Sequence, residues 1–249
     1  MKTMEILGLQ TVPEIKAGDN LAQIICDCAT RENIEIKEKD IIVFTSKIVS
    51  KALGSTRKLS DVKISKKALK LSKKTGKNPV WIQMILDTGH KIAAVVPMYG
   101  AIQKYILANS ADPQISEELC ESKRCLFMTL NPCGQLHTCD AGIDSSNHPV
   151  NEVSLIPDNP DEKAKTIREQ IQNITGKKVA VIISDTELTF YGTVDWALGC
   201  SGISPISQMF GEKDKFGKPK FGGFDLTAHQ IASAAALLFG QISSGIPAA

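Results

Sequence analysis

The chain has 249 residues, enough for one large domain or two small ones with a substantial buried core. Hydrophobic residues make up 43% and charged residues 22%, with a formal net charge of +2, which is typical of a soluble globular protein. Basic residues cluster between Lys63 and Lys77 without interleaved aromatic residues, so a solvated helix face is favoured over a nucleic-acid site.

Cysteine usage and hydropathy indicate where the protein resides. The seven cysteines include no CxxC pair and no zinc-finger spacing, which favours reduced thiols. The first 20 residues carry acids and a proline without a continuous apolar core, so no signal peptide is expected. No apolar run approaches the roughly 18 residues that span a bilayer. We therefore expect a cytoplasmic protein with no membrane and no nucleic-acid partner.

Strands are expected where apolar and β-favouring residues follow one another. The segments at 41–45 and 177–186 have the continuous apolar character of strands buried on both faces. A polar hinge, residues 45–47, should follow the first of them. The other expected strands are residues 4–12, a hairpin that turns at 131–134, and the end of a strand near residue 154.

Helices are expected where apolar residues recur at helical spacing between start and stop signals. Asp19 or Asn20 can cap the first helix, Pro79 starts another that Gly89 stops, and Gly176 stops a later amphipathic one. The expected helices are residues 21–33, the basic stretch 63–77, 79–88, one or two short helices in 98–124 around Asp112-Pro113, 160–175 and 226–241. Helices and strands without a steady βαβ rhythm predict an α+β fold with mixed sheets.

Two apolar strands deliver acidic and hydroxyl groups at their ends, in "CDAGIDSSN" and "VAVIISDTE". If Asp144 and Asp185 converge, they form a carboxylate pair that suits Mg²⁺, and Thr186 adds another oxygen. The alternative is that each aspartate caps a turn or a helix, and this is favoured for either residue alone. Gly142 is expected to turn the backbone sharply so that Asp144 can reach a metal.

Lys47 and Lys51 lie four residues apart after the strand at 41–45. On a helical turn their ammonium groups would share one face and could clamp phosphates. No P-loop pattern is present, and surface lysines are the default interpretation.

The histidines form no metal-binding pattern such as HxxH or HExxH. Structural roles are therefore favoured for His137 and His148, and nothing in the sequence assigns a role to His229. Asp140 is likewise expected to be structural.

Five segments taken in order resemble the coenzyme F-420-0:L-glutamate ligase family: "GLQTVPEIKAGDNLAQII", "KDIIVFTSKIVSKALG", "DAGIDSSN", "VAVIISDT" and "LLFGQISSGIP". The resemblance implies one γ-glutamyl ligase-like unit over residues 1–249, active as an intertwined homodimer. It implies a GTP-dependent enzyme that joins the amine of L-glutamate to a small-molecule acceptor carboxylate, activated as an acyl phosphate. Mg²⁺ or Mn²⁺ would assist and, as a further option, a monovalent cation.

The resemblance also assigns roles by position. Asp144 and Asp185 would hold one metal, with Thr186 and Gln241 near a second, and Lys51 and Asp144 would be the catalytic residues. The residues implied to contact nucleotide are Val12, Pro13, Glu14, Ile15, Ser46, Lys47, Lys51, Asn147, Phe239, Gly240, Gln241, Ile242, Ser243, Ser244, Gly245 and Ile246.

The chain departs from the family pattern in places that spare these residues, as an altered acceptor would. "ELTFYGTVDW" follows "SDT" without the usual arginine, Ala228-His229-Gln230 replaces an Ala-Asp-Glu triplet, and residues 98–124 look like an insertion. Three functions stay open: a ligase acting on an F-420-0-type deazaflavin, a folate γ-glutamyl ligase, which the missing arginine favours slightly, and a catalytically weak nucleotide- or metal-binding homologue.

Overall fold

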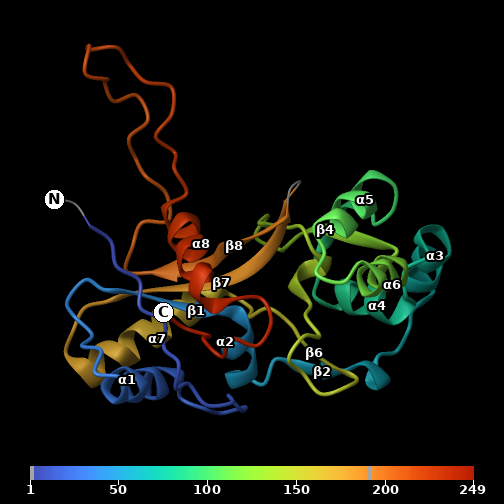
Figure 1. The fold of residues 1–249 in the computed structure, drawn as a ribbon, viewed down its shortest axis with the longest axis horizontal. Coiled ribbons are helices and arrows are strands. Elements are labelled where there is room, and N and C mark those ends of the chain that lie inside the picture. Colours follow the sequence, from blue (N-terminus) through green and yellow to red (C-terminus); the bar gives the residue numbers. More distant parts are fainter. Residues whose placement is uncertain (1–2, 190–191) are drawn as a thin grey trace. The chain divides into compact units, whose positions relative to one another are not determined.

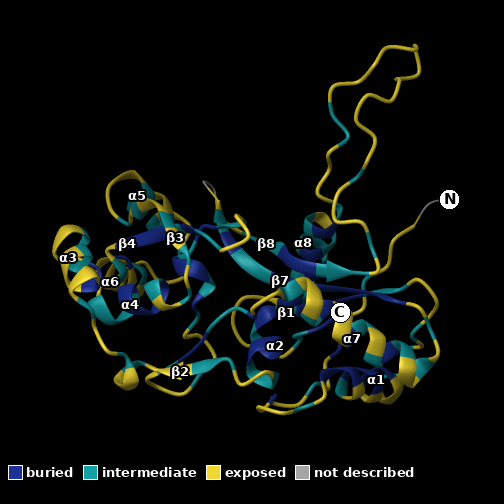
Figure 2. Cartoon of the chain, turned by 180° about the vertical axis from the view of Figure 1, so that it is seen from behind, coloured by how far each residue is buried: buried dark blue, intermediate teal, exposed yellow. Residues whose placement is uncertain are grey.

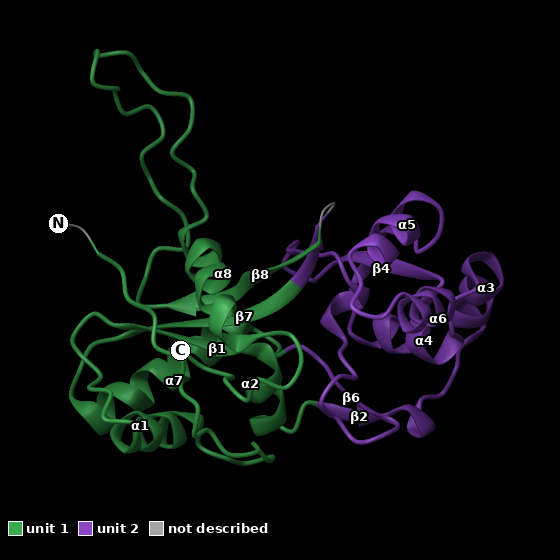
Figure 3. Cartoon of the chain, in the orientation of Figure 1, with its two compact units in different colours: residues 1–55, 157–186, 192–249 green, residues 56–156, 187–191 purple. Residues whose placement is uncertain are grey.

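The computed structural model describes residues 3–189 and 192–249, and the backbone divides into two compact units (Figure 3). Unit 1 comprises residues 1–55, 157–186 and 192–249, and unit 2 comprises residues 56–156 and 187–191. Helices combine with small mixed sheets, which confirms the predicted α+β class (Figure 1). The ligase-like fold, the single functional unit over 1–249 and the intertwined homodimer stay predictions.

Unit 1 is built on the sheet β1-β7-β8, formed by β1 (Ile41–Thr45), β7 (Ala180–Thr189) and β8 (Gly192–Ser201). β1 runs parallel to β7, with Ile41 opposite Ala180 and Thr45 opposite Ser184. Phe44, Val181 and Ile183 are fully buried. The two apolar segments are therefore the buried strands that the sequence predicts.

Helices cover both faces of this sheet. α1 (Leu21–Arg31) and α7 (Pro160–Thr175) share one core with Phe44 and Ile183. α8 (Thr227–Phe239) packs on the other face against Val43, Ile182 and Ala197. The buried side of α8 is a stripe of alanines, whose small side chains let the helix lie close to the strands. Asn20 caps α1 and Gly176 ends α7, as predicted.

The free edge of β1 is covered by residues 247–249. Val43 and Ala249 exchange two backbone hydrogen bonds, of 2.8 and 3.0 Å, and the Thr45 N–H donates to the Pro247 carbonyl at 3.0 Å. The strand predicted for residues 4–12 is wrong, because this edge is already occupied. Residues 3–16 instead lie outside any helix or strand, and the Leu9 N–H donates to the Ala248 carbonyl at 3.0 Å.

A long arm, residues 207–225, precedes α8 and contains the charged segment 211–223. Its two sides are joined by backbone hydrogen bonds, including Ser207 N to Asp225 O at 2.9 Å and Asp214 N to Lys218 O at 2.9 Å. The arm is exposed along most of its length (Figure 2).

Unit 2 joins short helices to two small sheets. Its helices are α3 (Lys66–Thr75), α4 (Pro79–Asp87), α5 (Ala101–Ala108) and α6 (Pro113–Lys123). One sheet pairs β2 (Thr56–Lys58) with β6 (Glu152–Ser154), and the other has the antiparallel order β3 (Lys91–Pro97), β4 (Cys125–Leu130), β5 (Leu136–His137). The hairpin turn at 131–134 and the helix break at Asp112-Pro113 are both confirmed.

The core of unit 2 holds a buried ion pair. α3 is the exposed basic helix that the sequence predicts, but Lys77 is only 3% exposed. Its Nζ donates to Asp140 Oδ2 at 2.7 Å, and Trp81 Nε1 donates to the same oxygen at 3.0 Å. Asp140 Oδ1 accepts from the Phe127 N–H at 2.9 Å. Asp140 is therefore structural, as predicted, whereas a solvated role is wrong for Lys77.

All seven cysteines carry free thiols, in agreement with the predicted reduced state. Within residues 3–189 and 192–249, no helix is both long and apolar enough to cross a bilayer.

Candidate functional site

The end of β1 and the middle of β7 bring two predicted site residues together in unit 1. α2 (Ser46–Ala52) begins directly after β1, so the predicted polar hinge is the first turn of a helix. Ser46 Oγ donates to Asp185 Oδ1 at 2.9 Å. Ser46 is buried and Asp185 is half-buried. A neutral hydroxyl thus orients this carboxylate without neutralising its charge.

A second carboxylate, Asp195 on β8, lies beside the same stretch of β7. Its Oδ1 accepts from Thr186 Oγ1 at 2.9 Å and its Oδ2 accepts from Ser184 Oγ at 2.8 Å. Asp195 is only 5% exposed. Because residues two apart on a strand share a face, Ser184 and Thr186 can both reach it. The sequence interpretation missed Asp195, although an acid inside the apolar run "VDWALG" was the available signal.

The loop after α8 reaches the same strand. Gln241 Nε2 lies 3.4 Å from Thr186 Oγ1, so two predicted metal ligands are in contact. Gly240, with φ of 63°, ends α8, and Ser244 Oγ donates back to the Phe239 carbonyl. A Cβ at Gly8 would lie 2.8 Å from Ile246 Cγ2, so the N-terminal segment packs closely on the far end of this loop.

Lys51 on α2 meets the predicted nucleotide-binding turn 12–15. Its Nζ lies 2.5 Å from Glu14 Oε1, and its side chain is 14% exposed against 75% for Glu14. Val12 and Ile15 pack into the core of unit 1, which fixes the turn in place. Lys47 lies one helical turn before Lys51, as predicted.

Asp144 and Asn147 lie in unit 2, on the segment that pairs with β6. The backbones of Asp144 and Ser154 exchange hydrogen bonds of 2.8 and 3.1 Å. The Asp144 carboxylate accepts from Ser146 N at 2.7 Å and from Ser146 Oγ at 3.0 Å. Asp144 therefore caps a turn, which is the alternative to metal binding that the sequence left open. These contacts leave metal binding untested. Because Asp185 belongs to unit 1, the pairing of the two aspartates stays a prediction.

The backbone before Asp144 turns as sharply as predicted. Gly142 has φ of 67°, in the left-handed region that favours glycine. Asp140 and Ala141 share positive φ values of 51° and 59°, so the turn involves three residues rather than one. The strain at Asp140 is held by the buried contacts of its carboxylate.

His137 is structural, as the sequence predicts. It is fully buried, and its Nδ1 lies 3.0 Å from Glu187 Oε1. Glu187 Oε2 accepts from the backbone N–H and the hydroxyl of Thr138. The other predicted structural histidine, His148, has a side chain that is 1% exposed and lies 4.0 Å from Glu152.

The side chains near the middle of β7 include oxygen atoms of the kind that hard divalent cations prefer. Asp185 supplies a carboxylate on one face of β7, and Thr186, on the other face, supplies a hydroxyl beside the Gln241 amide. Within the described part of the chain, no three His, Cys, Asp or Glu residues form a group that could hold a metal ion. Asp185 and the Thr186–Gln241 pair therefore stay predicted ligands of two separate cations.

The cysteines are poor candidates for a nucleophile. Burial, with a smaller contribution from Asp140, raises the pKa of Cys139 to about 12. Burial likewise raises the pKa of Cys26 to about 11. Both thiols are protonated at neutral pH, and the thiol is the unreactive form.

Comparison with known proteins identifies the family to which this sequence belongs. The family model for F420-0:Gamma-glutamyl ligase matches residues 10–249. The chain is 33% identical over 248 residues to coenzyme F420:L-glutamate ligase of Methanosarcina acetivorans, covering 98% of this chain and 84% of the relative. It is 32% identical over 247 residues to the protein of that name from Methanothermobacter thermautotrophicus, covering 98% and 87%. The chain therefore belongs to the F420-0:gamma-glutamyl ligase family.

Proposed function

We propose that this protein is a GTP-dependent ligase that forms an amide between L-glutamate and the carboxylate of an F-420-0-type deazaflavin. The observation that carries the proposal is the contact of predicted site residues within unit 1: Ser46 with Asp185, Thr186 with Gln241, and Lys51 with Glu14. All six residues lie inside the family match, on four separate segments of the chain. The relatives are named coenzyme F420:L-glutamate ligase, which supports the ligation of L-glutamate.

The reaction has two steps. The acceptor carboxylate attacks the γ-phosphorus of GTP, GDP leaves, and an acyl phosphate forms. The amine of L-glutamate then attacks the acyl carbon, phosphate leaves, and the nitrogen loses a proton to give the amide. The first step is needed because a free carboxylate is a poor electrophile.

The residues of unit 1 have distinct roles in this scheme. Lys51 brings positive charge to the transferred phosphoryl group, and Glu14 holds its ammonium in place. Asp185 would hold one divalent cation, with Ser46 fixing the orientation of its carboxylate, and Thr186 and Gln241 would lie near a second. When bound, Mg²⁺ or Mn²⁺ supplies positive charge that stabilises the phosphoryl transfer. Asp144 and Asn147 stay predicted ligands of metal and nucleotide.

The acceptor distinguishes the alternatives. The names of the relatives favour the deazaflavin, whereas the segment "ELTFYGTVDW", which lacks a basic residue, favours a folate. The protein should be incubated with GTP, Mn²⁺ and L-glutamate, with F-420-0 or tetrahydrofolate as acceptor, and the products weighed by mass spectrometry. One glutamyl residue added to F-420-0 supports the proposal. Addition to tetrahydrofolate alone would mean that the acceptor is a folate and not the deazaflavin. No addition to either, with GTP still bound, would indicate a binding homologue without turnover.

A second test addresses Asp144. Asp144→Asn removes a charge with little change in volume, so it should abolish turnover while the circular dichroism spectrum stays that of the wild type. Ser145→Ala, on the exposed neighbour of Asp144, is the matched control. Unchanged activity in Asp144→Asn would contradict the metal assignment.

We also propose that the protein is a homodimer and that the arm at 207–225 contributes to its interface. The arm exposes Met209, Phe216 and Phe221 by 48%, 75% and 93%, which is costly in water and favourable against a second chain. Size-exclusion chromatography with light scattering should give twice the chain mass. Phe216→Ser with Phe221→Ser should shift the mass toward the monomer, and a dimer of unchanged stability would exclude the arm from the interface.

A further inference from the structure

A pocket of about 420 Å³ opens on unit 1 at the first turns of α8. Its size is within the range of small-molecule sites. It is lined by Trp196, Asp225, Leu226, His229, Gln230 and Ser233. None of these residues has a place in the scheme above, so the pocket is available for a part of the substrates that the scheme leaves unassigned.

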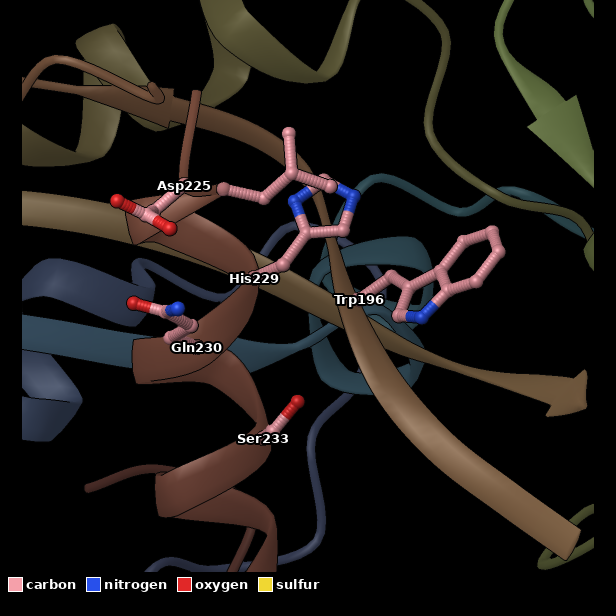
Figure 4. A pocket seen from close by; sticks show the side chains of 6 residues that line it. Trp196, Asp225, His229, Gln230 and Ser233 are labelled. Carbon is pink, nitrogen blue, oxygen red and sulfur yellow. The ribbon is translucent and has the colours of Figure 1, made fainter. Parts of the chain in front are cut away.

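Two aromatic rings form one side of the pocket. The His229 imidazole projects from α8 toward the Trp196 indole on β8 (Figure 4), with ring centroids 5.7 Å apart and an angle of 38° between the planes. Both residues are only half-buried. A ring pair that is tilted and partly open to solvent offers flat apolar surface for a third ring to stack on.

The polar atoms of the pocket complement this surface. His229 Nδ1 is buried and has no hydrogen-bond partner among the described residues. Burial lowers the pKa of His229, so the ring is neutral at pH 7 and has one donor and one acceptor nitrogen. Asp225 brings a carboxylate, which already accepts from Ser207 Oγ at 3.1 Å, and Gln230 brings an exposed amide. Together they offer acceptors for ring N–H groups.

The pocket is connected to the proposed metal ligands by hydrogen bonds. Ser233 Oγ donates to the backbone carbonyl of Asp195 at 2.7 Å. The carboxylate of Asp195 in turn accepts from Thr186 at 2.9 Å. A ring in the pocket would therefore be linked through Ser233 and Asp195 to Thr186, a proposed metal ligand of the same unit.

We propose that this pocket binds the planar nitrogen heterocycle of the acceptor, stacked against Trp196 and His229 with its N–H edge toward Asp225. The inference rests on the proposed function and extends it by assigning the recognition of the acceptor ring. Deazaflavin and pterin rings share this chemistry, and so does the guanine base of GTP. The acceptor ring is favoured over guanine because the predicted nucleotide contacts are at other positions: 12–15, 46, 47, 51, 147 and 239–246.

Binding experiments on the full chain separate these sources. The affinities of F-420-0, tetrahydrofolate and GTP should be measured by isothermal titration calorimetry for the wild type, Trp196→Ala, His229→Ala and Trp196→Phe. Leu237→Ala is the matched control, because Leu237 is on the same helix and 85% exposed but is not part of the pocket lining. Thermal unfolding of each variant identifies any that fail to fold, and Trp196→Phe keeps a flat ring where alanine would not be tolerated.

Trp196→Ala is expected to weaken binding of the preferred acceptor by about tenfold or more, since loss of one stacked aromatic ring has effects of this size. His229→Ala should weaken it less, and Trp196→Phe and Leu237→Ala should stay within about twofold of wild type. The affinity for GTP should not change. A selective loss of GTP affinity would instead assign the pocket to guanine. Unchanged acceptor binding in both alanine variants, with wild-type turnover intact, would overturn the pocket alone, whereas a wild type that binds neither acceptor would overturn the proposed function as well.

Discussion

Ser46 and Asp185 are 139 positions apart in the sequence, yet the Ser46 hydroxyl donates to the Asp185 carboxylate at 2.9 Å. The contact depends on the parallel pairing of β1 with β7, which sets Thr45 opposite Ser184. The residues that follow them, Ser46 and Asp185, therefore lie side by side. The orientation of a proposed metal ligand is thus a direct result of the strand register.

Substitution of these two residues should separate binding of the metal from its orientation. Asp185→Asn removes a charged ligand and should lower kcat by about 100-fold or more. Ser46→Ala removes only the orienting hydroxyl, so we expect a loss of about tenfold. Mn²⁺ affinity, followed by electron paramagnetic resonance, should fall in the same order. Equal activity of both variants and wild type would exclude this carboxylate from the site.

Asp195 should matter for stability as well as for the site. Its buried carboxylate accepts from two hydroxyl groups, and hydrogen bonds to a charged group contribute roughly 1.5–3 kcal/mol each. Asp195→Ala should therefore lower the free energy of unfolding in urea by about 3 kcal/mol. Ser184→Ala, which removes one of the two donors, should cost less than half as much. If the order of the two variants is reversed, the carboxylate is not the centre of this network.

Lys51 and Glu14 form an ion pair in which the lysine side chain is mostly buried and the glutamate side chain is mostly exposed. Lys51 is proposed to contact phosphate, so Lys51→Met should raise the KM for GTP by roughly 10- to 100-fold, the effect of losing one charged hydrogen bond. Glu14 is mostly exposed, and its loss in Glu14→Gln should change the KM less than fivefold, since exposed ion pairs contribute about 0–1 kcal/mol. Lys16→Met, at the exposed residue that follows this turn, serves as the control and should behave like wild type.

His90 should make the protein less stable in mild acid. Burial, and next the charge of His137, lowers the pKa of His90 below its ordinary 6.5. As the pH falls through 6.5 the unfolded chain takes up this proton before the folded protein does, so the free energy of unfolding decreases. Urea midpoints measured from pH 7.5 to 5 should fall less steeply for His90→Leu than for wild type.

His229 should also lower the free energy of unfolding in mild acid, independently of His90. Burial lowers its pKa too, so the double variant His90→Leu with His229→Leu should show the shallowest pH dependence of all. A wild-type slope retained in the double variant would assign the acid sensitivity to other groups.

Local sequence signals predicted most elements of the fold. Gly176 ends α7 in the left-handed conformation, and Pro79 begins α4 because a missing N–H costs nothing at a first helical turn. Asn131 and Gly134 form the hairpin turn between β4 and β5. These features depend on residues a few positions apart, so the sequence alone specifies them.

The errors involve partners that are distant in the sequence. Residues 4–12 have the composition of a strand, but residues 247–249 occupy the edge that they would join. Lys77 continues a run of exposed lysines, yet Asp140 draws it into the core of unit 2. In the sequence, Asp195 resembles an exposed acidic residue of a strand, but in the structure it accepts hydrogen bonds from Ser184 and Thr186. The pattern of neighbours along the chain contains none of these pairings.

The pairing of residues 247–249 with β1 also protects the protein from aggregation. A strand as apolar as β1, with unpaired N–H and C=O groups along one side, is a template on which strands of other molecules can add. Val43 and Thr45 direct their backbone groups to Ala249 and Pro247 instead. A variant in which this segment is displaced should remain folded in dilute solution, yet precipitate or form fibrils at concentrations where the intact chain stays dispersed.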